Sequence, residues 1–149
     1  MNIGNRLLII GGTLTGIAAL LHLAMILGGP DWYLFFGAGE EMAKLAASRS
    51  SCPAMNAAGI AVILSIWTLY AFSGAGLIRR LPFQRSVLVL VAGVFLMRGI
   101  VGVPMVLLMD DPYAMELRAR MTFVVVTSAV IFSLGLCYAI GTALLWRRF

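Results

Sequence analysis

Residues 87–109 read VLVLVAGVFLMRGIVGVPMVLLM, an apolar run that carries one charge, Arg98, near its middle. A helix needs roughly 20 apolar residues to cross a hydrocarbon core of about 30 Å, so this run is long enough to span a bilayer. Runs of the same kind occupy residues 7–28, 56–78 and 122–146. None of the four alternates apolar and polar residues as the strands of a membrane barrel do. The sequence therefore predicts an all-α integral membrane bundle of four helices.

The composition of the whole chain agrees with this prediction. Apolar residues make up 62% of the 149 residues, charged residues make up 11%, and the mean hydropathy is +1.01, which is outside the range of an ordinary soluble domain. The four runs leave no room for a separate soluble domain, so we expect residues 1–149 to form a single membrane domain. The short loop at residues 79–85 predicts that the second and third helices are antiparallel neighbours.

The distribution of charge predicts an orientation. The formal net charge is +5, but most basic residues lie at the ends of the predicted helices, which is typical of membrane topology and not of a nucleic-acid interface. If the helices alternate in direction, six arginines fall on one side of the membrane and all six acidic residues fall on the other. The arginines are Arg6, Arg79, Arg80, Arg85, Arg147 and Arg148, and the acids are Asp31, Glu40, Glu41, Asp110, Asp111 and Glu116. The positive-inside rule then places both termini in the cytoplasm.

The longest connection, over residues 30–51, is predicted to form a cap on the outer side. Trp32 and Tyr33 are typical of the membrane interface, and the stretch that begins at Glu40 has acids in its first turn and a Glu40–Lys44 pair at i,i+4, as short helices do. Two arrangements remain open. The cap is either a helical hairpin or re-entrant segment covered by protein, or an interfacial helix that lies on the surface.

Counting 1.5 Å per residue from the cytoplasmic ends places several polar side chains in one layer, roughly 16 to 22 Å deep. They are His22 in the first helix, Ser65 and Trp67 in the second, Arg98 in the third and Ser133 in the fourth. This layer has one fixed positive charge and no carboxylate. An arginine at the bilayer centre costs about 2.5 to 3.5 kcal/mol on insertion scales, so we expect a negative or strongly accepting group to meet Arg98.

Four kinds of partner fit Arg98. They are Glu40 or Glu41 of a cap that dips inward, backbone carbonyls freed by Pro104, the face of Trp67, and the anionic head of a lipid-like ligand. A glutamate makes Arg98 a structural tether, whereas a ligand makes it the centre of an intramembrane pocket. The candidate ligand-binding residues are Arg98, His22, Glu40, Glu41, Trp67, Tyr70 and Ser133.

Three functions are compatible with these residues. We expect a non-enzymatic binding or accessory subunit, whose Arg98-centred pocket holds an anionic lipid-like ligand or a membrane segment of a partner protein. The first alternative is an enzyme that acts on a lipidic substrate, with His22 as general base and Arg98 as electrostatic stabiliser. The second alternative is a transporter built as a homo-oligomer. A single histidine excludes bis-histidine haem, and no cofactor or metal is predicted.

In its size, helix count, polar middle layer and outer cap, the chain resembles small bacterial inner-membrane proteins of the DoxX-like kind. The resemblance implies a location in the inner (cytoplasmic) membrane. It rests on no motif, so it assigns no functional residue. Two other four-helix classes lack their defining residues. A VKOR-type enzyme needs a CxxC pair, which Cys52 and Cys137 do not form, and a small multidrug-resistance transporter needs a glutamate in the first helix, where this chain has His22.

Overall fold

The fold is that of a computed structural model, which describes residues 2–148. Over these residues the chain forms helices and no strands. In chain order they are α1 (Ile3–Gly28), α2 (Pro30–Phe35), α3 (Glu40–Ala47), α4 (Cys52–Gly74), α5 (Gln84–Leu108), α6 (Pro112–Arg118), α7 (Met121–Leu144) and the 3-10 turn η1 (Trp146–Arg148). Helices α1, α4, α5 and α7 are long and apolar enough to cross a membrane. The prediction of an all-helical membrane protein with four spans is thereby confirmed.

The spanning helices differ by a few residues from their predicted ranges. α1 begins before its predicted start because the side chain of Asn2 caps its first turn. α4 begins earlier than predicted, at Cys52, because Pro53 fits the first turn of a helix, and it ends at Gly74, shortly before Gly76 takes a positive φ of 79°. Hydropathy indicates which residues are apolar enough for the membrane interior, whereas the capping residues determine where the hydrogen-bonded helix begins and ends.

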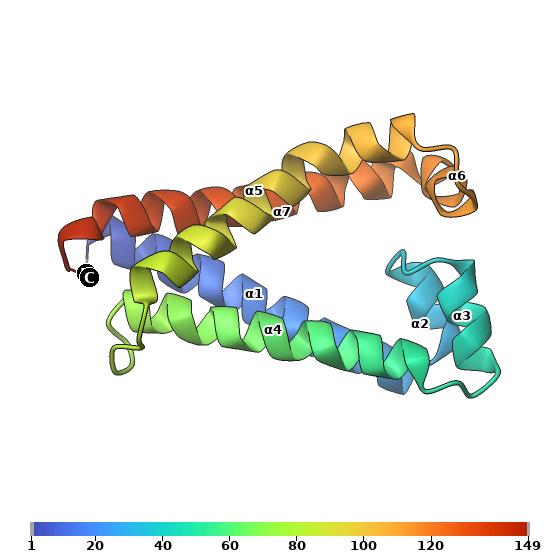
Figure 1. Ribbon diagram of the computed structural model, residues 1–149, viewed down its shortest axis with the longest axis horizontal. Helices are drawn as coiled ribbons and strands as arrows, with labels where there is room; N and C mark the ends of the chain where they lie inside the picture. The colour runs from blue at the N-terminus through green and yellow to red at the C-terminus, as the bar shows by residue number, and fades with distance from the viewer. Residues whose placement is uncertain (1, 149) are drawn as a thin grey trace.

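The four long helices form two arms of a V (Figure 1). One arm is α1 packed on α4, and the other is α5 packed on α7. The arms meet where α1 also packs on α7, and the chain ends there; we call this the narrow end. At the opposite, wide end, α2 and α3 cover the first arm and α6 covers the second. α4 and α5 are antiparallel as predicted, but they adjoin near their connecting loop and then diverge into different arms.

Small residues allow the helices within each arm to approach closely. A Cβ atom on Gly99 of α5 would lie 2.7 Å from the Cα atom of Phe132 on α7. A Cβ atom on Gly12 of α1 would lie 2.8 Å from the Cβ atom of Ala71 on α4. In lipid, where apolar side chains gain little by leaving the solvent, such close packing is a main source of helix association. Each arm is therefore a tightly packed pair.

All four long helices meet at Tyr138 of α7, which is fully buried. Its hydroxyl lies 3.2 Å from Oγ1 of Thr15 on α1 and 3.4 Å from the carbonyl O of Trp67 on α4. Its ring packs on Phe95 of α5, and Phe95 also makes an edge-to-face contact with the Trp67 ring at 5.2 Å between centroids. The hydrogen bonds of the Tyr138 hydroxyl and the packing of the aromatic rings thus join the two arms inside the bundle.

At the wide end, hydrogen bonds between side chains of one arm and the backbone of the other join the two arms. Three side chains, Tyr113, Glu116 and Arg120 of the α5–α7 arm, bind backbone atoms of the other arm, and we call these three the clasp. The Tyr113 hydroxyl donates to the carbonyl of Gly37 (2.8 Å), the N–H of Glu40 donates to Oε2 of Glu116 (3.0 Å), and Arg120 donates to the carbonyls of Leu34 and Phe35 (3.0 Å to Phe35). The connection predicted to be a cap therefore contains two short helices held to the opposite arm. Its placement on the outer side stays a prediction.

Candidate functional site

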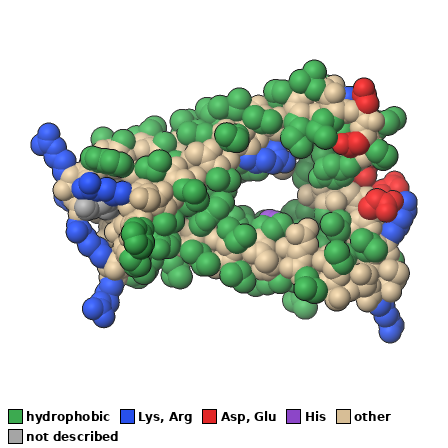
Figure 2. All heavy atoms as spheres, viewed as in Figure 1, with side chains coloured by type: hydrophobic (Ala, Val, Ile, Leu, Met, Phe, Trp, Pro, Cys, Tyr) green, Lys and Arg blue, Asp and Glu red, His purple; other side chains and the backbone are tan. Residues whose placement is uncertain are grey.

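The space between the arms is a chamber. Figure 2 shows an opening through the molecule, with basic side-chain atoms on one edge and histidine atoms on the opposite edge. One cavity of about 470 Å³ is lined from both arms, by His22 and Asn56 on one side and by Arg98 and Tyr113 on the other. A second cavity of about 350 Å³ runs along α5 to α6 and shares Arg98 and Tyr113 with the first. We call them the inter-arm cavity and the α5–α6 cavity.

Arg98 carries the one charge in the middle of the spanning helices, and it is unpaired. Its guanidinium lies over Gly102, one helical turn further along α5, where a Cβ atom would collide with Nη1. Across residues 2–148, the guanidinium forms no ion pair with a carboxylate and no hydrogen bond with a protein acceptor. Nearby Oγ of Ser128, on α7, is buried and also lacks a partner. The guanidinium donors therefore border the chamber without a protein group to satisfy them, and the Ser128 hydroxyl is unsatisfied inside the α5–α7 arm.

His22 faces the same inter-arm cavity from the opposite arm. Its Nδ1 atom lies 2.8 Å from the carbonyl O of Ala18 in the preceding turn of α1. Because a carbonyl can only accept, Nδ1 carries the proton in this bond. That leaves Nε2 without a partner in the described part of the chain. Arg98 and His22, which lie at similar predicted depths, thus line one cavity from two arms.

The structure does not bring Glu40 or Glu41 to Arg98. Both lie on the exposed surface of α3 and pair with Lys44, at 3.4 Å for Glu40 and 3.6 Å for Glu41. The i,i+4 pair expected in this helix is therefore present, and the two carboxylates raise the pKa of Lys44. They line a separate cavity between α3 and α6. Neither glutamate is positioned to act as the tether of Arg98.

Trp67, Tyr70 and Ser133 also lie away from the chamber. Trp67 belongs to the contacts around Tyr138, and the Tyr70 hydroxyl donates to the carbonyl of Pro82 in the α4–α5 loop (3.1 Å). The Ser133 hydroxyl is exposed and donates to its own helix. A depth count from the helix ends says nothing about the rotation of a helix. Side chains at one depth can therefore face different surroundings.

Two polar residues of the α5–α6 cavity were not among the predicted site residues. Tyr113 and Asp111 lie at the start of α6, in the connection between the third and fourth spanning helices, and both line the α5–α6 cavity. Burial raises the pKa of Tyr113, while the positive charge of Arg98 acts in the opposite direction. Tyr113 is therefore within electrostatic range of Arg98. The signal in the sequence was the Asp111-Pro112 step, a common helix start, directly after an apolar run.

The walls of the α5–α6 cavity are otherwise apolar. Val94, Met97, Val101 and Met105 line it from α5, and part of each side chain is exposed to the surroundings of the molecule. In a bilayer those surroundings are acyl chains. A guanidinium on the wall of a partly open apolar cavity can hold an anionic group while the cavity wall contacts a hydrocarbon tail.

The fold and the chamber define a polytopic helical membrane protein with a charged cavity between its spans. No family model matches the chain, and no curated protein or solved structure is similar to it. The likeness to DoxX-like proteins therefore rests on size and helix count alone.

Proposed function

We propose that this chain is a non-enzymatic binding or accessory protein of the bacterial inner membrane, in which Arg98 binds the anionic group of a lipid-like ligand. The observation that carries the proposal is the unpaired guanidinium on the wall of a partly open apolar cavity. Both cavities have volumes in the range of small-molecule sites. The DoxX-like resemblance supports the choice of membrane and nothing further.

The energetics favour a bound anion over an empty site. An arginine at the bilayer centre costs about 2.5 to 3.5 kcal/mol on insertion scales. A hydrogen bond to a charged group contributes roughly 1.5 to 3 kcal/mol, and a guanidinium can form two such bonds with one phosphate or carboxylate. Two bonds are therefore enough to offset the cost of placing Arg98 in the membrane.

His22 supports a second candidate function. With Nδ1 bonded to Ala18, its Nε2 atom is free to accept a proton inside the inter-arm cavity. An enzyme acting on a lipidic substrate would use this atom as general base and Arg98 to stabilise developing negative charge. The two functions differ in one measurable way, because only the enzyme converts the lipid it binds.

The proposal is tested by binding of lysophosphatidic acid to the purified protein in detergent. Replacing Arg98 by Gln should weaken binding by a factor of about 10 to 100, since it removes the charge-assisted bonds. Arg80→Gln removes the same charge from the exposed loop at the narrow end and should leave binding unchanged. Circular dichroism checks that both variants keep their helices.

Two outcomes would redirect this interpretation. Equal affinity of the wild type and a folded Arg98→Gln variant excludes Arg98 as the anion site. Breakdown of the bound lipid by the wild type, abolished in His22→Ala, identifies the protein as an enzyme.

A further inference from the structure

We propose that the α5–α6 cavity takes an amphiphile with a zwitterionic head group, whose anion lies at Arg98 and whose amine lies at Asp111 beside Tyr113. This inference rests on the proposed function and specifies its ligand. It starts from the charges that line the cavity. Arg98 and Asp111 are of opposite sign, belong to the same cavity, and do not form an ion pair with each other.

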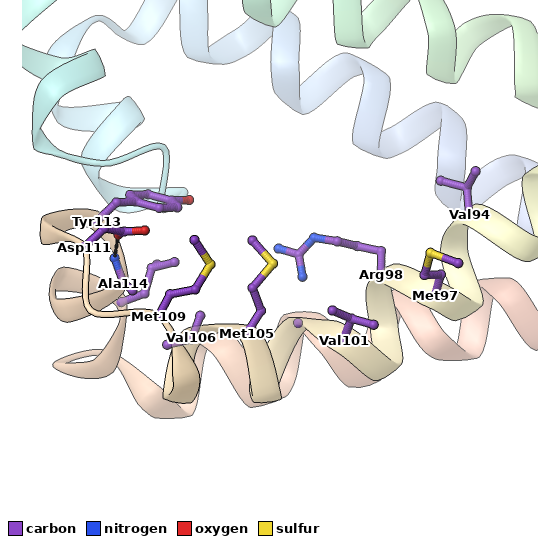
Figure 3. Close-up of a pocket in the computed structure, with 12 residues that line it drawn as sticks. Val94, Met97, Arg98, Val101, Met105, Val106, Met109, Asp111, Tyr113 and Ala114 are labelled. Carbon is purple, nitrogen blue, oxygen red and sulfur yellow. Dashed lines mark hydrogen bonds between the residues drawn. The ribbon is translucent and has the colours of Figure 1, made fainter.

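The two charges face the same space from opposite ends. Figure 3 shows the Arg98 guanidinium and the Asp111 carboxylate pointing into the region above Met105 and Met109, with the Tyr113 ring next to Asp111. The guanidinium lies over Gly102, and from Gly102 to the end of α5 at Leu108 the helix extends about 9 Å at 1.5 Å per residue. The separation prevents direct pairing and fits a head group in which several bonds separate anion from amine.

One of the two carboxylate oxygens of Asp111 is free to bind a ligand. Its Oδ1 atom accepts a 2.6 Å hydrogen bond from the N–H of Ala114 and thereby caps α6. Over residues 2–148, no side chain is hydrogen-bonded to Oδ2. The adjacent acid Asp110 differs, because it pairs with Arg118 at 3.1 Å. Asp111 thus presents an unpaired negative charge to the cavity.

The cations of the wide end that form polar contacts are engaged elsewhere. Lys44 binds the two glutamates of α3, Arg118 binds Asp110 and the last carbonyls of α5, and Arg120 binds the carbonyls of α2. None of these three cations therefore pairs with Asp111. An amine brought by the ligand would supply that charge.

Tyr113 and the methionines complete the amine end of the site. The Tyr113 hydroxyl is held by the carbonyl of Gly37 at 2.8 Å, so the ring has a fixed position against the cavity. A ring face attracts an ammonium group by a cation–π interaction. Met105 and Met109 form a flexible, polarizable wall that can adapt to the linker between the two ligand charges.

A ligand with only one charge fits this cavity less well. An amphiphile with an anionic head group leaves Asp111 facing a like charge in a medium of low dielectric. An amphiphile whose only charge is an amine leaves Arg98 unpaired. A zwitterion satisfies both residues at once. The combination of lining charges, and not Arg98 alone, therefore selects the head group.

The test compares two lysophospholipid probes that share one acyl chain and one phosphate. One is the aminohexyl phosphate ester and the other is the hydroxyhexyl ester, which has the same length and no positive charge. We expect the wild type to bind the aminohexyl ester about tenfold more tightly, which is the effect of one charge-assisted contact. Equal affinity of the wild type for the two probes overturns the inference, and this comparison needs no variant.

Two variants then assign the preference to Asp111. Asp111→Asn removes the charge and keeps a side chain that caps helices well, so it should abolish the tenfold preference without unfolding α6. Asp110→Asn makes the same change one residue earlier, outside the cavity lining, and should keep the preference. A preference that survives in folded Asp111→Asn overturns the inference while leaving the proposed function intact, provided that both probes still require Arg98. Binding of both probes that does not depend on Arg98 overturns the proposed function instead.

Discussion

At the scale of single residues, Gly102 decides where the Arg98 guanidinium can lie. A Cβ atom at this position would collide with Nη1 of Arg98 and would lie 2.6 Å from Oγ of Ser128. Both obstacles are ends of movable side chains, so Gly102→Ala should fold, but with the guanidinium displaced from the cavity wall. We expect lysophosphatidic acid to bind this variant about tenfold more weakly than the wild type, a loss equal to one charge-assisted hydrogen bond.

Gly93 provides the matched control on the same helix. A Cβ atom there meets nothing within 4 Å, so Gly93→Ala adds the same methyl group to α5 in open space. The replacement should raise helix stability by roughly 0.5 to 1 kcal/mol and leave lipid affinity unchanged. A Gly102→Ala variant that binds as tightly as Gly93→Ala would show that the position of the guanidinium does not matter. Thermal unfolding followed by circular dichroism measures the stability of both variants.

At the scale of elements, the clasp connects the two short helices α2 and α3 to the opposite arm. The Arg120 guanidinium caps the last carbonyls of α2, which a helix leaves free, and it lies over the Phe123 ring at 4.8 Å from the centroid. Arg120→Gln removes the charge-assisted part of this contact, worth roughly 1.5 to 3 kcal/mol. Amide hydrogen exchange in α2 and α3 should therefore become about tenfold faster, while exchange in α1 and α4 stays at its wild-type rate.

Lys44→Gln is the contrasting change at the same end. It removes two ion pairs whose side chains are more than 60% exposed, and exposed pairs typically contribute little to stability. Exchange in α2 should change little. If Lys44→Gln accelerates exchange in α2 as much as Arg120→Gln does, the connection between the arms depends on surface charge and not on the clasp.

The elements also show what the sequence could and could not predict. Hydropathy predicted the four spanning helices, because each is an apolar run long enough to cross the hydrocarbon core of a membrane. The i,i+4 spacing found the Glu40–Lys44 pair, because helix geometry determines which neighbours meet. Trp67 and Ser133 lie outside the chamber because depth along a helix does not determine which side of it faces another helix. The contact of Tyr113 with Gly37 joins residues far apart in the chain, and it depends on how the two arms diverge.

At the scale of the whole molecule, charge is divided between the two ends. In Figure 2 the acidic side chains gather at the wide end, and the charged side chains seen at the narrow end are basic. Arg6, Arg79 and Arg80 are exposed there, and Arg85 lies over the Trp146 ring at 5.2 Å. Anionic lipids and the positive-inside rule favour the cytoplasmic side for such an end. We therefore expect α2, α3 and α6 to face the opposite side of the membrane.

Cys52 allows this orientation to be measured without adding a label site. It is an exposed free cysteine at the start of α4, at the wide end, whereas Cys137 is partly buried within α7. A membrane-impermeant maleimide applied to cells with an accessible outer face of the inner membrane should modify the wild type and spare Cys52→Ser. In the Cys52→Ser background, Arg80→Cys places a thiol at the narrow end, which should react only after the membrane is permeabilised. The reverse pattern, with Cys52 protected and Arg80→Cys labelled in intact membranes, would place the chamber's capped end in the cytoplasm and contradict the positive-inside assignment.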